Sequence, residues 1–182
     1  MSQAIPVRSK LRYEHYVCYP DDGHRHEIID GDHYVNPAPN TKHQRYSGRI
    51  HFQLFDQIDE LQRGAVFAAP TDLQLADHDI VQPDLIVVMN ERRVIITPTK
   101  IEGIPNLIVE ILSPSTREND RVLKKGLYER AGVPEYWIVD PADQAIEQFV
   151  LRDTKYVLEG RPMTSVTAAT IENLRVDLTK VW

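Results

Sequence analysis

The sequence has little cysteine, no long apolar run and no excess of positive charge, and each shortage excludes a class of protein. Its single cysteine, Cys18, cannot form an intramolecular disulfide bond. No apolar run approaches the roughly 20 residues that span a bilayer, and residues 1–10 lack the apolar core of a secretory signal. We therefore expect a cytoplasmic protein that does not enter the membrane. Because the net charge is −6, contact with nucleic acid requires a local basic patch.

Several sequence motifs that are diagnostic of particular activities are also absent. The sequence contains no Walker loop, no glycine-rich dinucleotide motif and no nucleophile elbow. Its seven histidines show no paired spacing with cysteine, which argues against a zinc site. At 182 residues the chain fits one domain over residues 1–182 with a single core, and residues 1–12 are expected to form a flexible arm.

The first half of the chain predicts a hairpin followed by a helix. Residues 25–35 alternate around Asp30-Gly31, a dipeptide typical of tight turns with positive φ. Residues 13–19 fit either a short helix or an edge strand. Apolar side chains then recur at the spacing of an amphipathic helix of about twenty residues, namely Ile50, Leu54, Ile58 and Leu61.

The second half alternates apolar segments with turn signals. Ser115 and Glu118 fit a capping box for a helix that should run to about Ala131, ahead of Gly132. Residues 146–158 predict a second hairpin, and residues 90–105 a loop. Strands are expected at residues 65–69, 73–75, 84–89, 107–112 and 135–140, with a weak one at 94–96.

Two acidic side chains are attached to the most apolar of these segments. Asp84 precedes four apolar residues, and Glu110 lies inside the run 107–112. An ionised carboxylate is costly to bury without a compensating cation, and two of them about 4 Å apart repel by roughly 4 kcal/mol at an effective dielectric near 20. A divalent metal between them removes both costs. Oxygen ligands favour magnesium or manganese, so these are the expected cofactors.

The predicted elements occur in the order helix, strand, strand with acid, strand with acid, helix, strand. This order, with Pro83-Asp84 at the second strand, resembles the αβββαβ core of the PD-(D/E)xK nuclease superfamily. That pattern places a lysine two residues after the second acid, where this chain has Leu112. Further motifs resemble the Uma-type restriction endonucleases, in which the following helix supplies the lysine: residues 109–116, Asp120-x-x-x-Lys124-x-x-x-Tyr128, and residues 132–141.

The resemblance spans roughly residues 25–158 and implies a fold and a site. The fold would be α/β (α+β), with a restriction-endonuclease-like mixed sheet flanked by helices and with added N-terminal and C-terminal hairpins. Asp84 and Glu110 would bind the metal, and Lys124 would be the catalytic lysine. Asp120, one helical turn earlier, would hold that lysine through an i, i+4 pair. The supporting residues that it implies are Glu27, His43, Asp120 and Tyr128.

The activity implied is metal-dependent phosphodiester hydrolysis, with DNA as the substrate and a homodimer as the assembly because double-strand cleavage needs two sites. Two alternatives remain open. The same site could act on RNA or on a small phosphate ester, or the chain could be a non-catalytic binding or structural module that kept the fold, as its acidity would suit.

Two structural readings compete with these roles. Asp84 could be a strand-start carboxylate that accepts amide hydrogen bonds, and Lys124 could be a solvated helix lysine. Even as the catalytic lysine, Lys124 is expected to lie on a helix surface, so that truncating it costs little stability. Basic residues cluster on two predicted helices, and their convergence at the site would favour DNA. One group comprises Lys42, Arg45 and Arg49, and the other Arg117, Arg121, Lys124, Lys125 and Arg130.

Overall fold

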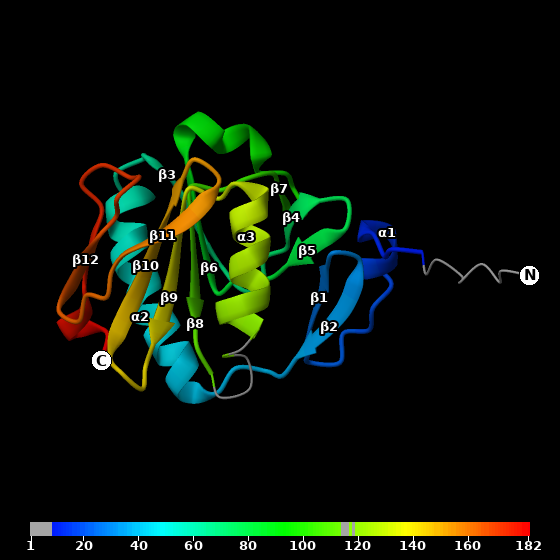
Figure 1. The fold of residues 1–182 in the computed structure, drawn as a ribbon, viewed down its shortest axis with the longest axis horizontal. Coiled ribbons are helices and arrows are strands. Elements are labelled where there is room, and N and C mark those ends of the chain that lie inside the picture. The colour runs from blue at the N-terminus through cyan, green and yellow to red at the C-terminus, as the bar shows by residue number, and fades with distance from the viewer. Residues whose placement is uncertain (1–8, 114–116, 118) are drawn as a thin grey trace, which may run out of the picture.

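A six-stranded mixed sheet forms the centre of the computed structural model, which describes residues 9–113, 117 and 119–182 (Figure 1). Its strands lie in the order β11-β10-β9-β8-β6-β3. The pair β8–β9 is parallel, and the other four neighbouring pairs are antiparallel. A parallel pair needs a crossover connection, which here contains a helix. The strands are β3 Gly64–Ala68, β6 Leu85–Met89, β8 Leu107–Ile111, β9 Glu135–Asp140, β10 Ala145–Arg152 and β11 Lys155–Gly160.

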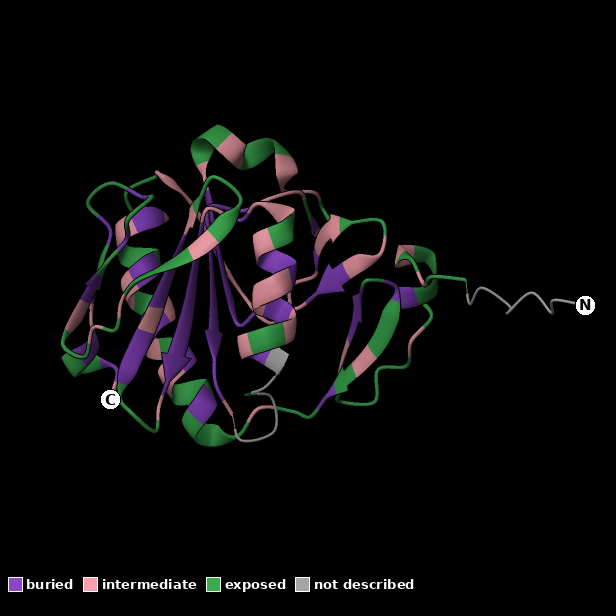
Figure 2. Ribbon diagram, in the orientation of Figure 1, coloured by how far each residue is buried: buried purple, intermediate pink, exposed green. Residues whose placement is uncertain are grey.

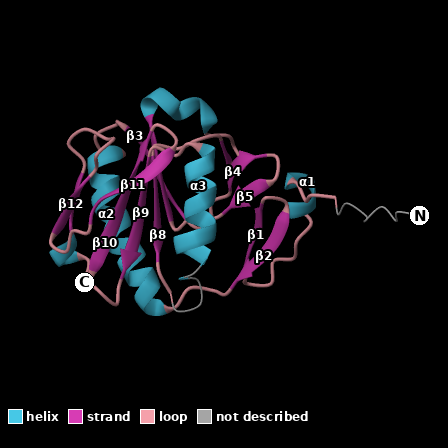
Figure 3. Cartoon of the chain, in the orientation of Figure 1, coloured by secondary structure: helices cyan, strands magenta, loops and turns pink. Residues whose placement is uncertain are grey.

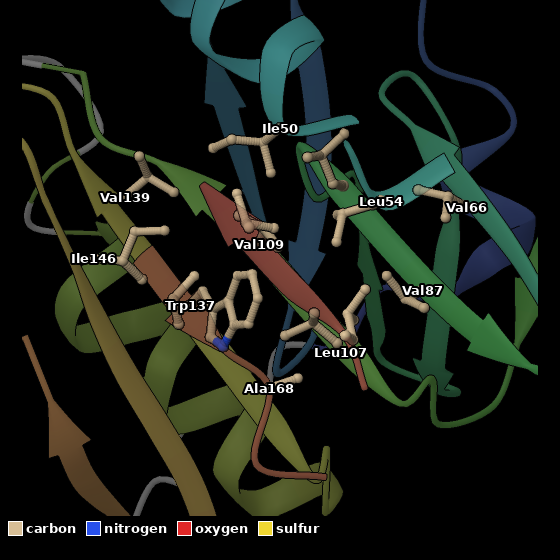
Figure 4. Close-up of a cluster of buried hydrophobic side chains, with 14 of the residues drawn as sticks. Ile50, Leu54, Val66, Val87, Leu107, Val109, Trp137, Val139, Ile146 and Ala168 are labelled. Carbon is tan, nitrogen blue, oxygen red and sulfur yellow. The ribbon is translucent and has the colours of Figure 1, made fainter. Parts of the chain in front are cut away.

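Two helices cover opposite faces of this sheet, α2 (Thr41–Ile58) and α3 (Lys125–Ala131) (Figure 3). Because strand side chains alternate between faces, Val109 packs in the cluster with α2 and Ile108 in the cluster with α3. Figure 4 shows Ile50 and Leu54 of α2 among the inward side chains of the strands. The α2 side also receives the C-terminal segment, which contains β12 Ser165–Thr167, β13 Arg175–Asp177 and the 3₁₀ helix η3 Leu178–Lys180.

A second, five-stranded sheet lies beside the α3 face in the order β2-β1-β5-β4-β7 (Figure 1). Its residues Ile29, Leu73 and Val81 pack in the same cluster as Leu127 of α3. The short helix α1 (Tyr13–Tyr16) packs on this sheet. The strands are β1 Arg25–Ile29, β2 Asp32–Asn36, β4 Leu73–Ala76, β5 Asp79–Val81 and β7 Ile101–Glu102.

The αβββαβ core and both hairpins are confirmed. The first hairpin turns at Asp30 and Gly31, whose φ angles of 52° and 81° are the positive values that the dipeptide predicts. The ambiguous segment at residues 13–19 contains a helix rather than an edge strand. Burial follows the topology, since β8 and β9 are buried along their lengths (Figure 2).

Two predictions are wrong in detail. Leu61 lies beyond the end of α2 and is 64% exposed, because the helix ends at Ile58. The weak strand predicted at 94–96 is instead mostly part of a 3₁₀ helix, η1 (Asn90–Ile95), whose end is fixed by an isolated bridge from Ile96 to Ile101. The capping box at Ser115 and Glu118, and most of the predicted arm, lie outside the described residues. Within the described part of the chain, no helix is both long and apolar enough to cross a membrane.

Candidate active site

The two predicted acids meet where β6 and β8 pair. The antiparallel register places Leu85 opposite Val109. Asp84 and Glu110 are the next residues at the same end of this pair, so they lie beside each other. Oδ2 of Asp84 accepts a hydrogen bond from the backbone N–H of Ile111 at 2.8 Å, and the backbone N–H of Asp84 lies 3.4 Å from Oε2 of Glu110. The side chains of Asp84 and Glu110 are only 3% and 2% exposed. The chain therefore buries two neighbouring carboxylates in its core.

The direction of the Glu110 side chain follows from its position in β8. Glu110 alternates with Val109 and Ile111 of the α2 face, so it projects to the α3 face. There its Oε1 accepts hydrogen bonds from the ammonium of Lys124 at 2.9 Å and from the hydroxyl of Tyr128 at 2.8 Å. The helix after β8 therefore supplies the lysine that the strand itself lacks.

Lys124 is a buried residue, which excludes the alternative of a solvated helix lysine. It ends a π-helical turn, η2 (Asn119–Lys124), that leads directly into α3, and it is 4% exposed. Its Nζ lies 2.9 Å from Glu110, 3.0 Å from Glu27 and 3.8 Å from Asp120. The predicted i, i+4 pair with Asp120 is present but is the longest of the three. Since three carboxylates surround this ammonium, truncating it cannot be nearly neutral for stability.

Glu27 reaches the same point from the second sheet. Its Oε1 accepts from Lys124 and from the backbone N–H of Gln82 at 2.9 Å, and its Oε2 accepts from the Asn36 side-chain amide at 2.7 Å. Gln82 is two residues before Asp84, so this contact ties β1 to the loop that carries Asp84. Glu27 is consequently an internal acid, 1% exposed, rather than a surface acid of a hairpin.

Two further cationic or cation-forming side chains hold Asp84. A guanidinium nitrogen of Arg25 lies 2.7 Å from Oδ1, and Nε2 of His43 lies 2.9 Å from Oδ2. His43 occupies the first turn of α2, where Asn40 caps the helix by accepting the backbone N–H of His43. Nδ1 of His43 is buried and has no hydrogen-bond partner among the residues that the structure describes.

The cluster holds more acid than base. Among the described residues it contains four carboxylates and two side chains with a permanent positive charge, Arg25 and Lys124, so the formal charge of these groups is −2 when His43 is neutral. The carboxylates are Glu27, Asp84, Glu110 and Asp120.

The surroundings shift the pKa values of Asp84 and Glu110 in opposite directions. Burial raises the pKa of Glu110 to about 8, assisted by the charges of Asp120, Asp84 and Glu27 and opposed by Lys124. Burial also acts to raise the pKa of Asp84, but His43 and Arg25 outweigh it, and the pKa of Asp84 falls below its ordinary value. Near neutral pH, Glu110 therefore carries the proton and Asp84 the charge.

The lysine and the tyrosine remain protonated. Burial acts to lower the pKa of Lys124, but Glu110, Glu27 and Asp120 raise it well above its usual value. Burial and the charge of Glu110 raise the pKa of Tyr128 well above that of a free phenol. Both side chains are consequently hydrogen-bond donors to Glu110.

A cavity of about 270 Å³ opens onto this cluster and is lined by Asp84, Glu110, Asp120 and Lys124. Among the described residues, no group of three or more histidine, cysteine, aspartate or glutamate side chains is arranged as a ready set of metal ligands. The oxygens of Asp84 instead face Arg25 and His43. The donor set still fits a hard divalent cation, because its oxygens are carboxylates and two positive charges would balance the cluster.

Arg25 and Asn36 belong to the cluster but were not predicted from the sequence. The signal for Arg25 was present, since it lies two residues before Glu27 in a predicted strand and hence on the same face. Asn36 ends β2 opposite Arg25, and nothing in its local sequence marks it as a partner of Glu27.

The two basic groups meet only in part. Lys42 and Arg117 line one cavity of about 630 Å³ together with His43, while Arg117 also pairs with the buried Asp140 at 2.8 Å. Arg49 binds the backbone carbonyls of Val181 and Trp182. Lys125 lies over the ring of Phe149, away from the site. Positive charge therefore reaches the rim of the site without forming one continuous basic face.

A mixed sheet between two helices, with acids on adjacent strands and a lysine from the crossover helix, defines a nuclease-like α/β protein. A family model described as "Putative restriction endonuclease", Uma2, matches residues 13–178. The chain belongs to this family.

A solved structure has the same fold. It is described as a "putative nuclease" of the DUF820 group from Anabaena variabilis, and it matches with a TM-score of 0.74 at 18% sequence identity. The match covers 94% of this chain and 97% of that one. No curated protein matches the chain in the corresponding sequence comparison.

Proposed function

We propose that this protein is a metal-dependent phosphodiester hydrolase that cuts DNA, with Asp84 and Glu110 as ligands of magnesium or manganese. The observation that carries the proposal is the buried ammonium of Lys124, 2.9 Å from Glu110 in a cluster with two excess carboxylates. A structural ion network has no need of surplus negative charge, whereas a cation-dependent site does. When bound, the metal would polarise the phosphate and lower the pKa of the attacking water.

The remaining residues have roles that follow from their contacts. Lys124 lies at the wall of the cavity and would neutralise charge that develops on the phosphate. Tyr128 and Glu27 are positioning residues, because Tyr128 orients Glu110 and Glu27 holds Lys124. Asp120 adds a weaker contact to that ammonium. His43 and Arg25 would keep Asp84 ionised before the metal arrives.

The direct test is a cleavage assay on supercoiled plasmid. Wild type should convert it to nicked or linear DNA with manganese or magnesium, and EDTA should abolish the conversion. The double variant Asp84→Asn, Glu110→Gln, purified in parallel, controls for a contaminating nuclease. Activity that persists in EDTA, or that the double variant retains, would refute the proposed mechanism.

We also propose that two copies act together, since each chain carries one such cluster and double-strand cleavage needs two cuts. Linear product should then appear with little nicked intermediate, and the protein should sediment as a dimer. A monomer that accumulates nicked DNA would restrict the function to single-strand cutting.

One observation favours a second candidate, a non-catalytic module with the same fold. Both oxygens of Asp84 already have cationic or cation-forming partners, Arg25 and His43. A metal that takes Asp84 must compete with them for its oxygens. If manganese neither binds nor supports cleavage, the closed ion network is the function of these residues, and it stabilises the junction of the two sheets.

A further inference from the structure

A second cavity, of about 550 Å³, adjoins the cavity of the candidate active site. The two share the lining residues Arg25, Ala38 and Pro39. Arg25 is the side chain that holds Asp84, and so one wall of the second cavity is in direct contact with the carboxylate cluster. A ligand with a phosphate at that cluster would therefore extend its neighbouring group into the second cavity.

One part of the lining is an aromatic surface built around Tyr19. The rings of His26 and His33 are nearly coplanar, at 15°, and their nitrogens approach to 2.9 Å edge to edge. Both rings stack on Tyr19, at centroid distances of 5.1 and 4.1 Å. Two rings that lie side by side in one plane must cover the same face of Tyr19. On its other sides Tyr19 has the ring of Tyr16 edge-on, at 79° and a centroid distance of 6.0 Å, and it lines the second cavity.

Another part of the lining is polar and fixed by hydrogen bonds. The hydroxyl of Tyr16 donates to Oδ1 of Asp72, and the side-chain amide of Gln82 donates to that same oxygen and to the Tyr16 hydroxyl, each at 2.9 Å. Oδ2 of Asp72 accepts no hydrogen bond from any residue that the structure describes. The network thus fixes a carboxylate with one oxygen engaged and the other free to accept from a ligand.

We propose that this cavity binds one nucleobase of the nucleic-acid substrate, next to the phosphate held at the carboxylate cluster. An aromatic ring at the wall of the cavity and a fixed hydrogen-bonding group are the features that recognition of an unstacked base uses. Since Asp72 offers an acceptor, the cavity prefers a base with an exocyclic amine, such as cytosine or adenine, over thymine, which has none. This inference rests on the proposed function for its ligand class, but it concerns binding and does not depend on the metal.

Asp72→Asn changes the free position and removes one negative charge. The amide oxygen of asparagine retains the contacts with Tyr16 and Gln82, while the free acceptor becomes an NH₂ donor. Asp77→Asn is the matched control, because it removes the same charge at an exposed turn outside both cavities. Tyr19→Leu tests stacking separately.

The experiment measures fluorescence anisotropy of labelled dC, dA and dT 12-mers titrated with the full chain in EDTA. Wild type and Asp77→Asn should bind dC and dA about tenfold more tightly than dT. In Asp72→Asn that ratio should fall toward one, and Tyr19→Leu should weaken binding of all three by roughly tenfold.

Equal ratios in wild type and Asp72→Asn, or no binding at all, would overturn the inference. The cleavage assay separates it from the proposed function. A protein that cuts DNA without an Asp72-dependent preference refutes the base site alone. One that shows the preference but never cuts refutes the nuclease alone.

Discussion

Nζ of Lys124 lies 2.9 Å from Oε1 of Glu110 although the two residues are on different elements, a helical turn and a strand of the central sheet. Glu110 faces α3 because side chains alternate between the two faces along β8. The π-helical turn η2 ends at Lys124. π-helical turns occur often at functional sites, where they reposition side chains within a helix.

Replacing Lys124 by methionine should destabilise the protein. The variant removes the ammonium from between Glu27, Glu110 and Asp120 and leaves buried carboxylates unpaired, which costs about 3–5 kcal/mol. Thermal denaturation measures the loss, and manganese should restore part of it by supplying positive charge. Lys125→Met is the control and should lose only about 0.5–1 kcal/mol, since Lys125 contacts the face of Phe149.

The same pair of variants tests the catalytic role of the lysine. Under conditions where Lys124→Met remains folded, its cleavage rate should fall by about 10²- to 10³-fold, the usual effect of removing a group that stabilises developing charge. Lys125→Met should retain most of the activity. Single-turnover rates at saturating manganese make the comparison, and equal rates for the two variants would exclude Lys124.

Asp84→Asn should weaken manganese binding by about tenfold or more, because the site loses one of its two strand carboxylates and affinity for hard cations depends on ligand charge. Isothermal titration calorimetry measures the affinity directly. Asp77→Asn, an exposed substitution with the same change of charge, should have no effect. Undiminished binding in Asp84→Asn would remove this residue from the site.

Manganese affinity should depend on pH through Glu110. Its pKa is raised to about 8 by burial, so below pH 8 the metal must displace a proton. Affinity should therefore rise about tenfold per pH unit from pH 6 toward pH 8 and level off above it, with about one proton released per metal at pH 6. Calorimetry in buffers of different ionisation enthalpy counts the proton. In Glu110→Gln the dependence should vanish, and a flat profile in wild type would contradict the assignment.

Tyr128→Phe should raise the pKa of Glu110 further. The hydroxyl of Tyr128 donates to Oε1, a bond that favours the carboxylate form, and a hydrogen bond to a charged group contributes about 1.5–3 kcal/mol. That energy is about one to two pKa units, so manganese binding should be strongly weakened at pH 7 and less weakened at pH 9, where more of Glu110 is ionised. A deficit that is the same at both pH values would mean that Tyr128 acts only through packing.

Much of the site could be predicted because its signals are local. Asp84 and Glu110 are acidic residues next to apolar runs in the sequence. The turn at Asp30-Gly31 and the helix end at Gly132 are each predicted by the residue types at those positions. The resemblance to a known family added Lys124, Glu27 and His43, and the structure brings all of these side chains into one cluster.

The remainder depends on contacts that no local pattern encodes. Glu27 is buried because β1 pairs with β5 through Ile28 and Ile80, residues that are distant in sequence. Periodicity places Arg25 on the same face of the strand as Glu27, but only that pairing brings it to Asp84. A lysine on a helix is normally expected at the surface. Lys124 is buried because the second sheet packs beside α3.

The most direct test of the central claim is anomalous diffraction from crystals of the protein soaked in manganese. The account predicts a peak in coordination contact with carboxylate oxygens of both Asp84 and Glu110, with Arg25 or His43 displaced from Asp84. An absence of any peak there, with both of those contacts to Asp84 intact, would contradict it.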